Sequence, residues 1–320
     1  MDKRVYGVLG ISAVMANWNA DFSGYPKTTT GGDIFGSDKA FKYPMKRMWA
    51  DAGEKVLYIK SLHLMKEKKN GEVNLVPRTL KERYEQIFEV EDLKKDKNVE
   101  DILKNLFQAV DVKNFGATFA EEGANISITG AVQIGQGFNK YADADPQEQN
   151  ILSPFKDPKA SEKSKDGTDA KNSTLGTKIV CDEAHYFYPF AINSNVYNEF
   201  MELGVTQGYT DEDYVQFKKA SLIAATSFST NSKAGCENEF GMFIETENNL
   251  YLPNLDKYIT FEKEEDKNVI HVIGNDFIKD VKDRVKSIEI YYNPLTTELD
   301  CDIEDARYYN IISMKEISRM

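Results

Sequence analysis

The strongest constraint on the fold is the run RVYGVLGISAVM at residues 4–15. Small and β-branched residues fill this run, and its apolar positions alternate, a pattern typical of a strand that is buried on at least one face. Such a strand opens a hydrophobic core that further layers have to cover. With 41% hydrophobic residues over 320 positions, the chain can bury a sizeable core. We interpret 1–320 as a single elaborated domain.

Helix and strand patterns continue after this first strand. A loop rich in Gly, Asn and Thr leads to Ser37, which can cap a helix, and Pro44 inside that helix predicts a kink or a later start. Strands are predicted at 56–64 and 126–138, and two amphipathic helices within 79–110. Helix-linked strand pairs of this kind indicate an α+β fold with an RRM-like, or ferredoxin-like, antiparallel sheet.

Three later segments complete this interpretation. Residues 65–110 are interpreted as a largely helical insertion between the strands. Residues 139–180 are rich in Lys, Asp, Ser and Pro and lose periodicity, so they are predicted to form a long, mobile excursion. Residues 288–303 are predicted to form a hairpin that completes the sheet.

Composition narrows the classes of function. The net charge of -12 argues against an indiscriminate polyanion binder, so a nucleic-acid site has to be a local basic patch. No stretch approaches the roughly 20 apolar residues of a membrane span, and the first residues lack signal-peptide features, so we expect a cytoplasmic protein without a membrane partner. Three scattered cysteines and three histidines signal neither a disulfide framework nor a metal site, and no cofactor is expected.

A basic stripe on the helix after Ser37 is the sharpest local feature. Lys39, Lys42 and Lys46 recur at spacings of three and four, with Arg47 beside them, in a span that contains no acid after its first residue. On spacing alone, a solvated amphipathic helix is the more ordinary explanation. The neighbouring Gly-rich polar loop favours phosphate binding, because backbone N–H groups and lysines can follow one strand together.

Other candidate residues have equally ordinary alternatives. Gln133 and Gln136 lie among glycines that let another backbone approach, although the same glycines can mark a bulge. Phe138 can stack a base or belong to the core. Asp21 and Asp33 flank the loop and could hold a metal or act as a general base, but loop aspartates usually make local turns. No catalytic residue is therefore predicted.

Six segments of the chain occur in a distinctive order. They are NWNADFSGYPKTT, FGSDKAFKYPMKRMW, DVKNFGATF, ITGAVQIGQG, STLGTK with AHYFYPFAIN, and STNSKAGCENEFGMFI. This order resembles the CRISPR-associated Cas-seven backbone family, nearest its Csh-two branch of subtype I-B. The resemblance covers about residues 4–247.

The resemblance implies an RRM-like palm, a finger-like insertion at 65–110 and a thumb-like hairpin within 139–180. Copies would stack head to tail along a CRISPR guide RNA as the non-enzymatic backbone of a type I Cascade complex, beside other Cascade subunits, and the guide would pair with target DNA. The RNA-binding residues predicted from the motifs and the patterns above are Asn17, Asn19, Lys27, Ser37, Lys39, Lys42, Lys46, Arg47, Gln133, Gln136 and Phe138. Ile151, Leu152 and Phe155 are predicted to form the wedge of the thumb against displaced bases.

Two other functions stay open at this point. The chief alternative is a divalent-metal ribonuclease, as in the backbone subunits of related type III complexes, where Asp21 or Asp33 would promote cutting of target RNA. A scaffold that binds only proteins is the third.

Overall fold

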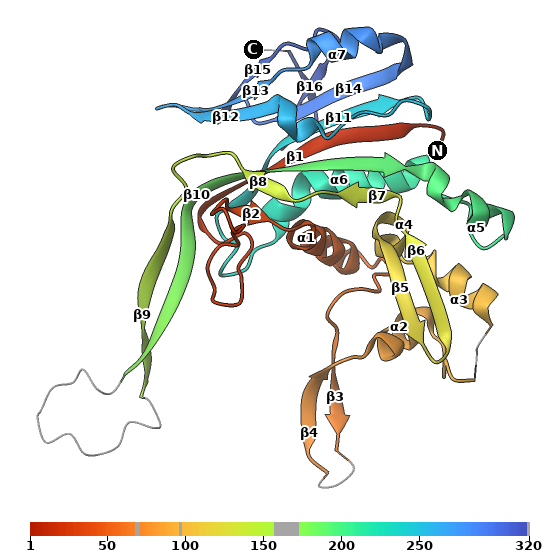
Figure 1. Ribbon diagram of the computed structural model, residues 1–320. Helices are drawn as coiled ribbons and strands as arrows, with labels where there is room; N and C mark the ends of the chain where they lie inside the picture. Colours follow the sequence, from red (N-terminus) through yellow and green to blue (C-terminus); the bar gives the residue numbers. More distant parts are fainter. Residues whose placement is uncertain (68–70, 96–97, 157–172, 319–320) are drawn as a thin grey trace, which may run out of the picture.

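The computed structural model describes residues 1–67, 71–95, 98–156 and 173–318, and within these ranges a ten-stranded sheet forms its centre (Figure 1). β1 (Arg4–Ala16) pairs antiparallel with β10 (Ser173–Asn193) on one side and β11 (Cys236–Thr246) on the other. The sheet order is β17-β16-β14-β11-β1-β10-β8-β2, and β7 and β9 also pair with β10. The other strands are β2 (Phe35–Gly36), β7 (Val132–Ile134), β8 (Gly137–Asn139), β9 (Pro146–Lys156), β14 (Val285–Tyr292), β16 (Arg307–Asn310) and β17 (Glu316–Ile317).

β1 is buried on both faces, which explains its apolar sequence. Val5 and Leu9 belong to the core cluster on the helix-covered face, whereas Tyr6 and Val8 belong to a second cluster on the opposite face. Successive side chains of a strand point to opposite faces, so every position of such a strand needs an apolar or small residue. The prediction of a core strand at 4–15 is confirmed.

The helix after the first loop starts where its cap predicts. α1 (Asp38–Asp51) begins after Ser37, whose Oγ accepts a hydrogen bond from the backbone N–H of Ala40 at 3.3 Å. Pro44 lies inside the helix without delaying its start, so the prediction of a later start is wrong. The cap decides the boundary because it satisfies an N–H group that the helix itself leaves unpaired.

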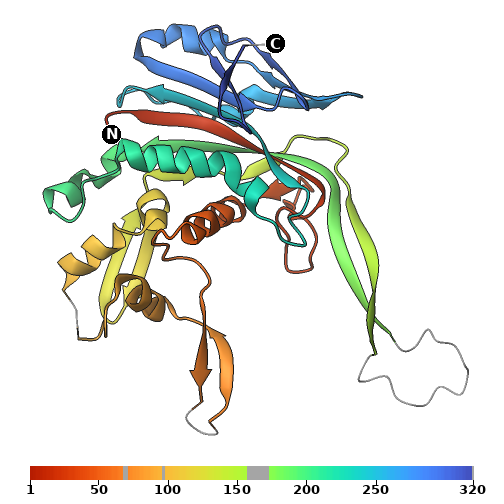
Figure 2. The same ribbon diagram turned by 180° about the vertical axis from the view of Figure 1, so that it is seen from behind.

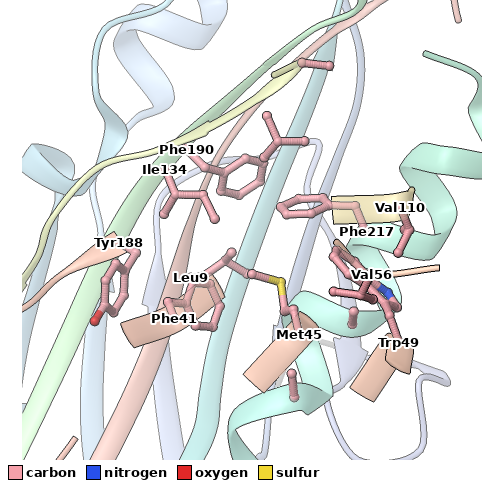
Figure 3. Close-up of a cluster of buried hydrophobic side chains, with 14 of the residues drawn as sticks. Leu9, Phe41, Met45, Trp49, Val56, Val110, Ile134, Tyr188, Phe190 and Phe217 are labelled. Carbon is pink, nitrogen blue, oxygen red and sulfur yellow. The ribbon is translucent and has the colours of Figure 1, made fainter. Parts of the chain in front are cut away.

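α1 and α6 (Asp211–Ser227) cover one face of the sheet (Figure 1). Phe41, Met45 and Trp49 recur every four residues on α1 and point into the core cluster with Leu9 and Tyr188 (Figure 3). Residues four apart share one side of a helix, so this spacing fixes which side of α1 meets the sheet. The lysine positions of α1 are thereby turned away from the sheet.

A smaller sheet covers the other face. It consists of β12 (Ile259–Lys263), β13 (Asn268–Val272) and β15 (Thr297–Cys301), beside α7 (Asn275–Asp280), and it packs on the second core cluster. β14 stays in the main sheet, whereas β15 pairs parallel with β13, so the predicted hairpin at 288–303 is wrong. The turn at Asn293, whose carbonyl accepts from the N–H groups of Thr296 and Thr297, sends the chain into the smaller sheet.

The strand predicted at 56–64 is also wrong. The N–H groups of Leu57 and Tyr58 donate to the carboxylate of Asp111, each at 2.8 Å, so a side chain replaces a strand partner there. The strand begins later, as β3 (Leu62–Lys66), and pairs with β4 (Val73–Pro77) in a hairpin outside the main sheet. Residues 56–64 therefore supply no strand to the main sheet.

The single strand predicted at 126–138 is divided among three. β6 (Ala124–Thr129) pairs with β5 (Gly116–Glu121) in a separate hairpin, whereas β7 and β8 pair with β10. The break falls at Gly130, where a β-carbon would overlap the backbone of Phe115 and Gly116. Only glycine allows this close approach.

Both helices predicted within 79–110 are present as α2 (Leu80–Phe88) and α3 (Val99–Leu106). Part of the β3–β4 hairpin lies in the same 65–110 segment, so the segment is less purely helical than predicted. The remaining helices and helical turns in the described residues are α4 (Val110–Phe115), η2 (Ser194–Tyr197), α5 (Asn198–Glu202), η3 (Leu255–Tyr258) and η4 (Lys282–Arg284). No helix in the described part of the chain has the length and apolar character of a membrane span.

Within 139–180, β9 and the first part of β10 pair to form a two-stranded arm. We call this pair, residues 146–156 with 173–181, the arm. The arm and the β3–β4 hairpin project from the body in the same direction, as the front and back views show (Figures 1 and 2). The structure therefore combines an α+β body with two protruding hairpins.

Candidate nucleic-acid interface

The loop between β1 and α1 is shaped by its own asparagines. Asn17 is buried and donates from Nδ2 to the carbonyl of Gly24 at 2.8 Å. Asn19 accepts the N–H of Ser37 on Oδ1 at 2.7 Å, and its carbonyl accepts the N–H of Lys27 at 2.9 Å. The Asn19 side chain thus holds the loop against the start of α1, whereas the Asn17 side chain holds it to Gly24 and to Ile179 on β10. The predicted contact of both residues with RNA stays a prediction.

An open hollow of about 430 Å³ lies where this loop, the start of α1 and β8 meet. The hollow brings together five of the predicted RNA-binding residues from three separate segments of the chain. Its lining consists of Lys27, Thr29, Phe35, Ser37, Asp38, Lys39, Gln136 and Phe138. Beside the carboxylate of Asp38, the lining offers two ammonium groups, two hydroxyls, an amide and two aromatic rings. Groups of these kinds can hold a single nucleic-acid strand without selecting its sequence.

The pairing of β2 with β8 places the aromatic side of the hollow. Phe35 lies opposite Phe138 in this pair, and their ring centres are 6.0 Å apart. Phe138 is 41% exposed, whereas its neighbour Gly137 is buried against the ring of Tyr188. The alternation of the strand therefore turns the Phe138 ring outward, where its face is accessible for stacking.

The three lysines of the stripe have different surroundings. Lys39 is exposed and lines the hollow. Lys42 lies 2.8 Å from the carboxylate of Asp38, and Lys46 lies 3.6 Å from that of Asp111 and 3.3 Å from the carbonyl of Tyr58. Only the first turn of α1 thus presents an ammonium group directly to the hollow.

Burial changes the chemistry of Lys46. It lowers the pKa of the ammonium below its ordinary value, although Asp111 acts in the opposite direction. The ring centre of Phe115 lies 5.9 Å from the same ammonium group. Lys46 therefore links α1 to α4, and a contact with RNA would have to replace this internal pairing. Arg47 is more exposed and pairs with Asp51 one turn later, at 2.9 Å.

The remaining predicted residues lie outside the hollow. Gln133 on β7 is exposed and donates from Nε2 to the carbonyl of Gly130 at 2.8 Å. Ile151 and Leu152 lie on the arm with exposed fractions of 46% and 70%. The side chain of Phe155 lies outside the described residues. The wedge role of these three residues stays a prediction.

The two loop aspartates are engaged in local turns. One carboxylate oxygen of Asp21 accepts from the N–H and hydroxyl of Ser23, at 2.8 and 2.7 Å, and from the N–H of Tyr25 at 3.1 Å. Asp33 accepts the hydroxyl of Thr29 at 3.1 Å. These contacts match the ordinary role of a loop aspartate.

Lys233 supports the loop and was missed by the sequence analysis. Its ammonium donates to the carbonyls of Asn17 and Trp18 at 2.5 and 2.6 Å. Burial lowers the pKa of Lys233 from its ordinary value. Lys233 lies in the segment STNSKAGCENEFGMFI, which carried part of the family resemblance. That segment alone does not predict a contact with Asn17, 216 residues earlier.

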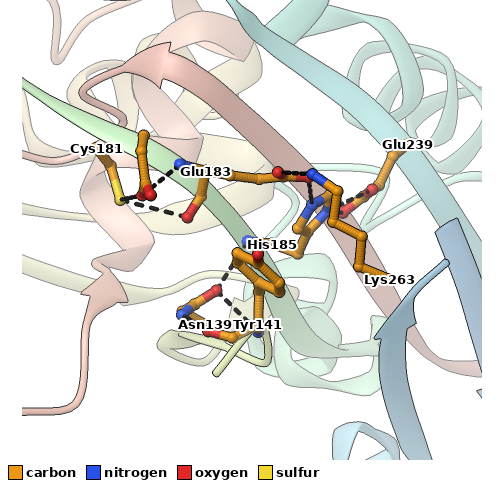
Figure 4. A network of polar contacts seen from close by, with 8 residues as sticks. Asn139, Tyr141, Cys181, Glu183, His185, Glu239 and Lys263 are labelled. Carbon is orange, nitrogen blue, oxygen red and sulfur yellow. Dashed lines mark hydrogen bonds and ion pairs between the residues drawn. The ribbon is translucent and has the colours of Figure 1, made fainter. Parts of the chain in front are cut away.

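A charged cluster joins the main sheet to the smaller one (Figure 4). His185 on β10 is fully buried, with Nδ1 2.8 Å from Glu239 on β11 and Nε2 3.1 Å from Glu183. Lys263 on β12 pairs with Glu183, and the ring of Phe261 stacks on His185 with centres 3.9 Å apart. His185 therefore has a structural role, because its contacts join β10, β11 and β12.

Comparison with solved structures identifies the fold. A chain described as "CRISPR RNA-guided surveillance complex, pre-nicking" aligns over 97% of this chain and 98% of its own length, with 15% identity and a TM-score of 0.54. A chain described as "CRISPR RNA-guided surveillance complex" aligns over 89% and 88%, with 13% identity and a TM-score of 0.42. The first of these likenesses shows a shared fold.

Comparison of the sequence with family models identifies the family. The family model for CRISPR-associated protein Cas7 matches residues 3–282. The chain therefore belongs to the Cas7 family. No curated protein sequence gives a significant match.

Proposed function

We propose that this chain binds a CRISPR guide RNA as a repeated, non-enzymatic backbone subunit of a type I Cascade complex, nearest subtype I-B, in the cytoplasm. Family membership and the shared fold support this role. The observation that carries it is the hollow that gathers Lys27, Lys39, Gln136 and Phe138 from distant parts of the chain. Its partners are further copies of the chain placed head to tail, other Cascade subunits, and target DNA by way of the guide.

The topology supports the assignment of a palm, a finger and a thumb. The order β11-β1-β10-β8, with α1 and α6 on one face, agrees with the order expected of a ferredoxin-like, RRM-like sheet. In this proposal the arm is the thumb, and the β3–β4 hairpin with α2 and α3 forms the finger. The exposed Ile151 and Leu152 on the arm agree with a wedge that enters between bases.

The chemistry of the hollow suits contact with an RNA backbone. Lys27 and Lys39 offer charge to phosphates, while Ser37 and Gln136 offer hydrogen bonds. The face of Phe138 can take a base of any identity, because every base has an aromatic face. The protein thereby holds the guide by its backbone and leaves the sequence to be read by pairing with DNA.

Lysine substitutions test this assignment through their salt dependence. Lys39→Ala removes an exposed cation of the hollow, so the slope of log affinity against log salt for single-stranded RNA should flatten by about 0.7. Lys42→Ala and Lys46→Ala should flatten it less, because these cations already have internal carboxylate partners. Lys219→Ala, at an exposed lysine of α6 outside the hollow, is the matched control and should leave the slope unchanged.

An unchanged slope in Lys39→Ala would remove this lysine from the RNA-binding site. The absence of catalysis is tested separately by incubating the assembled complex with magnesium and RNA complementary to the guide. We expect intact RNA, and regularly spaced cuts would contradict the proposal.

A further inference from the structure

Phe22 is the most exposed large apolar side chain among the described residues. Its exposed fraction is 112%, so every part of the ring meets solvent. A ring in this position adds nothing to the hydrophobic stability of the chain, because no apolar surface is buried. Its position therefore suits contact with something outside the chain.

The turn that carries this ring is closed by several hydrogen bonds. The N–H of Asp21 donates to the carbonyl of Tyr25 at 2.8 Å, and Ala20 and Pro26 form an antiparallel bridge beside them. Gly24 has a φ of +93°, which glycine adopts without strain. Phe22 thus stands on a preorganised turn, so little conformational freedom is lost when its ring binds a partner.

The same turn is fastened to the base of the arm. Asn17 donates from Nδ2 to the carbonyl of Gly24 at 2.8 Å and to that of Ile179 on β10 at 3.4 Å. A β-carbon at Gly24 would lie 3.4 Å from the side chain of Ile179. The position of the Phe22 ring is therefore set relative to β10.

The surroundings of Phe22 favour a nucleobase over a protein as the partner of its ring. Phe22 is flanked in sequence by Asp21, Ser23 and Gly24, which are polar or small. The other exposed ring of the turn is that of Tyr25, at 36%. Protein interfaces are built on contiguous apolar patches, whereas a single accessible ring is enough to stack one base. One carboxylate oxygen of Asp21 is engaged by the N–H groups of Ser23 and Tyr25.

The turn is also continuous with the hollow. Lys27, which lines the hollow, follows Phe22 by five residues, and an extended chain of that length spans at most about 17 Å. We infer that Phe22 stacks on a base of single-stranded RNA at the outer end of a track that continues through Lys27 to Lys39 and Phe138. This inference rests on the proposed function and adds a base contact from the first loop.

Paired substitutions and paired RNAs test the inference. Full-length protein is titrated with fluorescent single-stranded RNA and with the same RNA carrying abasic sites. Phe22→Ala should weaken binding of the intact RNA by about 5- to 150-fold, and Phe22→Leu similarly, since leucine keeps apolar area without a ring. Phe22→Trp should keep the affinity, and Leu295→Ala, at an exposed apolar residue on another loop, should not change it.

The abasic RNA separates stacking from contact with phosphates. Wild type and Phe22→Ala should bind it equally, because it offers no base to the ring. If wild type binds the intact RNA and Phe22→Ala binds it as tightly, the stacking role is overturned while the proposed function stands. If Phe22→Ala changes only the sedimentation of the protein, the ring contacts another protein and the inference is also overturned. If wild type binds no RNA, the proposed function fails.

Discussion

Asp111 joins three parts of the structure and provides a sharp test of how they are held together. Its carboxylate is fully buried, accepts the N–H groups of Leu57 and Tyr58 at 2.8 Å each, and lies 3.6 Å from the ammonium of Lys46. Asp111→Ala would leave two backbone donors without their acceptor and a largely buried cation without its counter-charge. Each of these losses destabilises the folded state.

The expected loss is about 3–5 kcal/mol of unfolding free energy, the range found when one member of a buried ion pair is removed. The unpaired N–H groups alone account for about 1–3 kcal/mol each where they stay dry, so the two estimates overlap and are not added. Urea unfolding followed by far-ultraviolet circular dichroism measures the loss as a lower midpoint at unchanged slope.

Two further variants separate the contributions. Asp111→Asn keeps an acceptor for one N–H group and should lose less stability than Asp111→Ala. In the Lys46→Met background, substitution of Asp111 should cost less than in the wild type, because the buried cation is already absent. A loss below about 1 kcal/mol in Asp111→Ala would refute the assignment of Asp111 as the fastening of this region.

The buried charged cluster and the tight packing of β2 give two more predictions. Burial by itself lowers the pKa of His185, but the carboxylates of Glu239 and Glu183 raise this pKa above its ordinary value of 6.5. The protonated imidazole therefore contributes its full stabilisation below about pH 6.5, and this stabilisation is lost as the pH rises through the raised pKa. The difference in unfolding free energy between wild type and His185→Gln should shrink over that window, and a constant difference would exclude the mechanism. Gly36→Ala should destabilise the protein by about 1–3 kcal/mol, because its β-carbon would overlap the hydroxyl of Tyr188. Gly176→Ala, with its nearest neighbouring atom 3.9 Å away, is the control in thermal unfolding, and equal melting temperatures would contradict the overlap.

Local patterns predicted the elements whose boundaries are set by neighbouring residues. Ser37 caps α1 by accepting the N–H of Ala40, three residues later, and the spacing of Phe41, Met45 and Trp49 identifies the buried side of the helix. The failures depend on partners far along the chain. Residues 56–64 have the composition of a strand, but Asp111, more than 50 residues later, takes up two of their N–H groups.

The candidate site shows the same difference between local patterns, which the sequence reveals, and long-range contacts, which it does not. The residue types that favour RNA binding are visible as Lys27, Lys39, Gln136 and Phe138, whereas their gathering depends on the pairing of β2 with β8 about 100 residues apart. The ion pair between Lys46 and Asp111 also joins residues far apart in the sequence. The spacing of lysines on one helix could therefore not reveal that Lys46 is paired inside the protein while Lys39 is exposed. Contact of these residues with RNA stays a prediction that the salt-dependence experiment decides.

β10 imposes a rule on how the arm can change in length. This one strand of 21 residues supplies both a side of the arm and a central member of the main sheet. Adding one residue between these two parts would reverse the facing of every side chain on one of them. Residues added between the two parts therefore keep the facing of both only in even numbers, and each added pair lengthens the strand by about 7 Å.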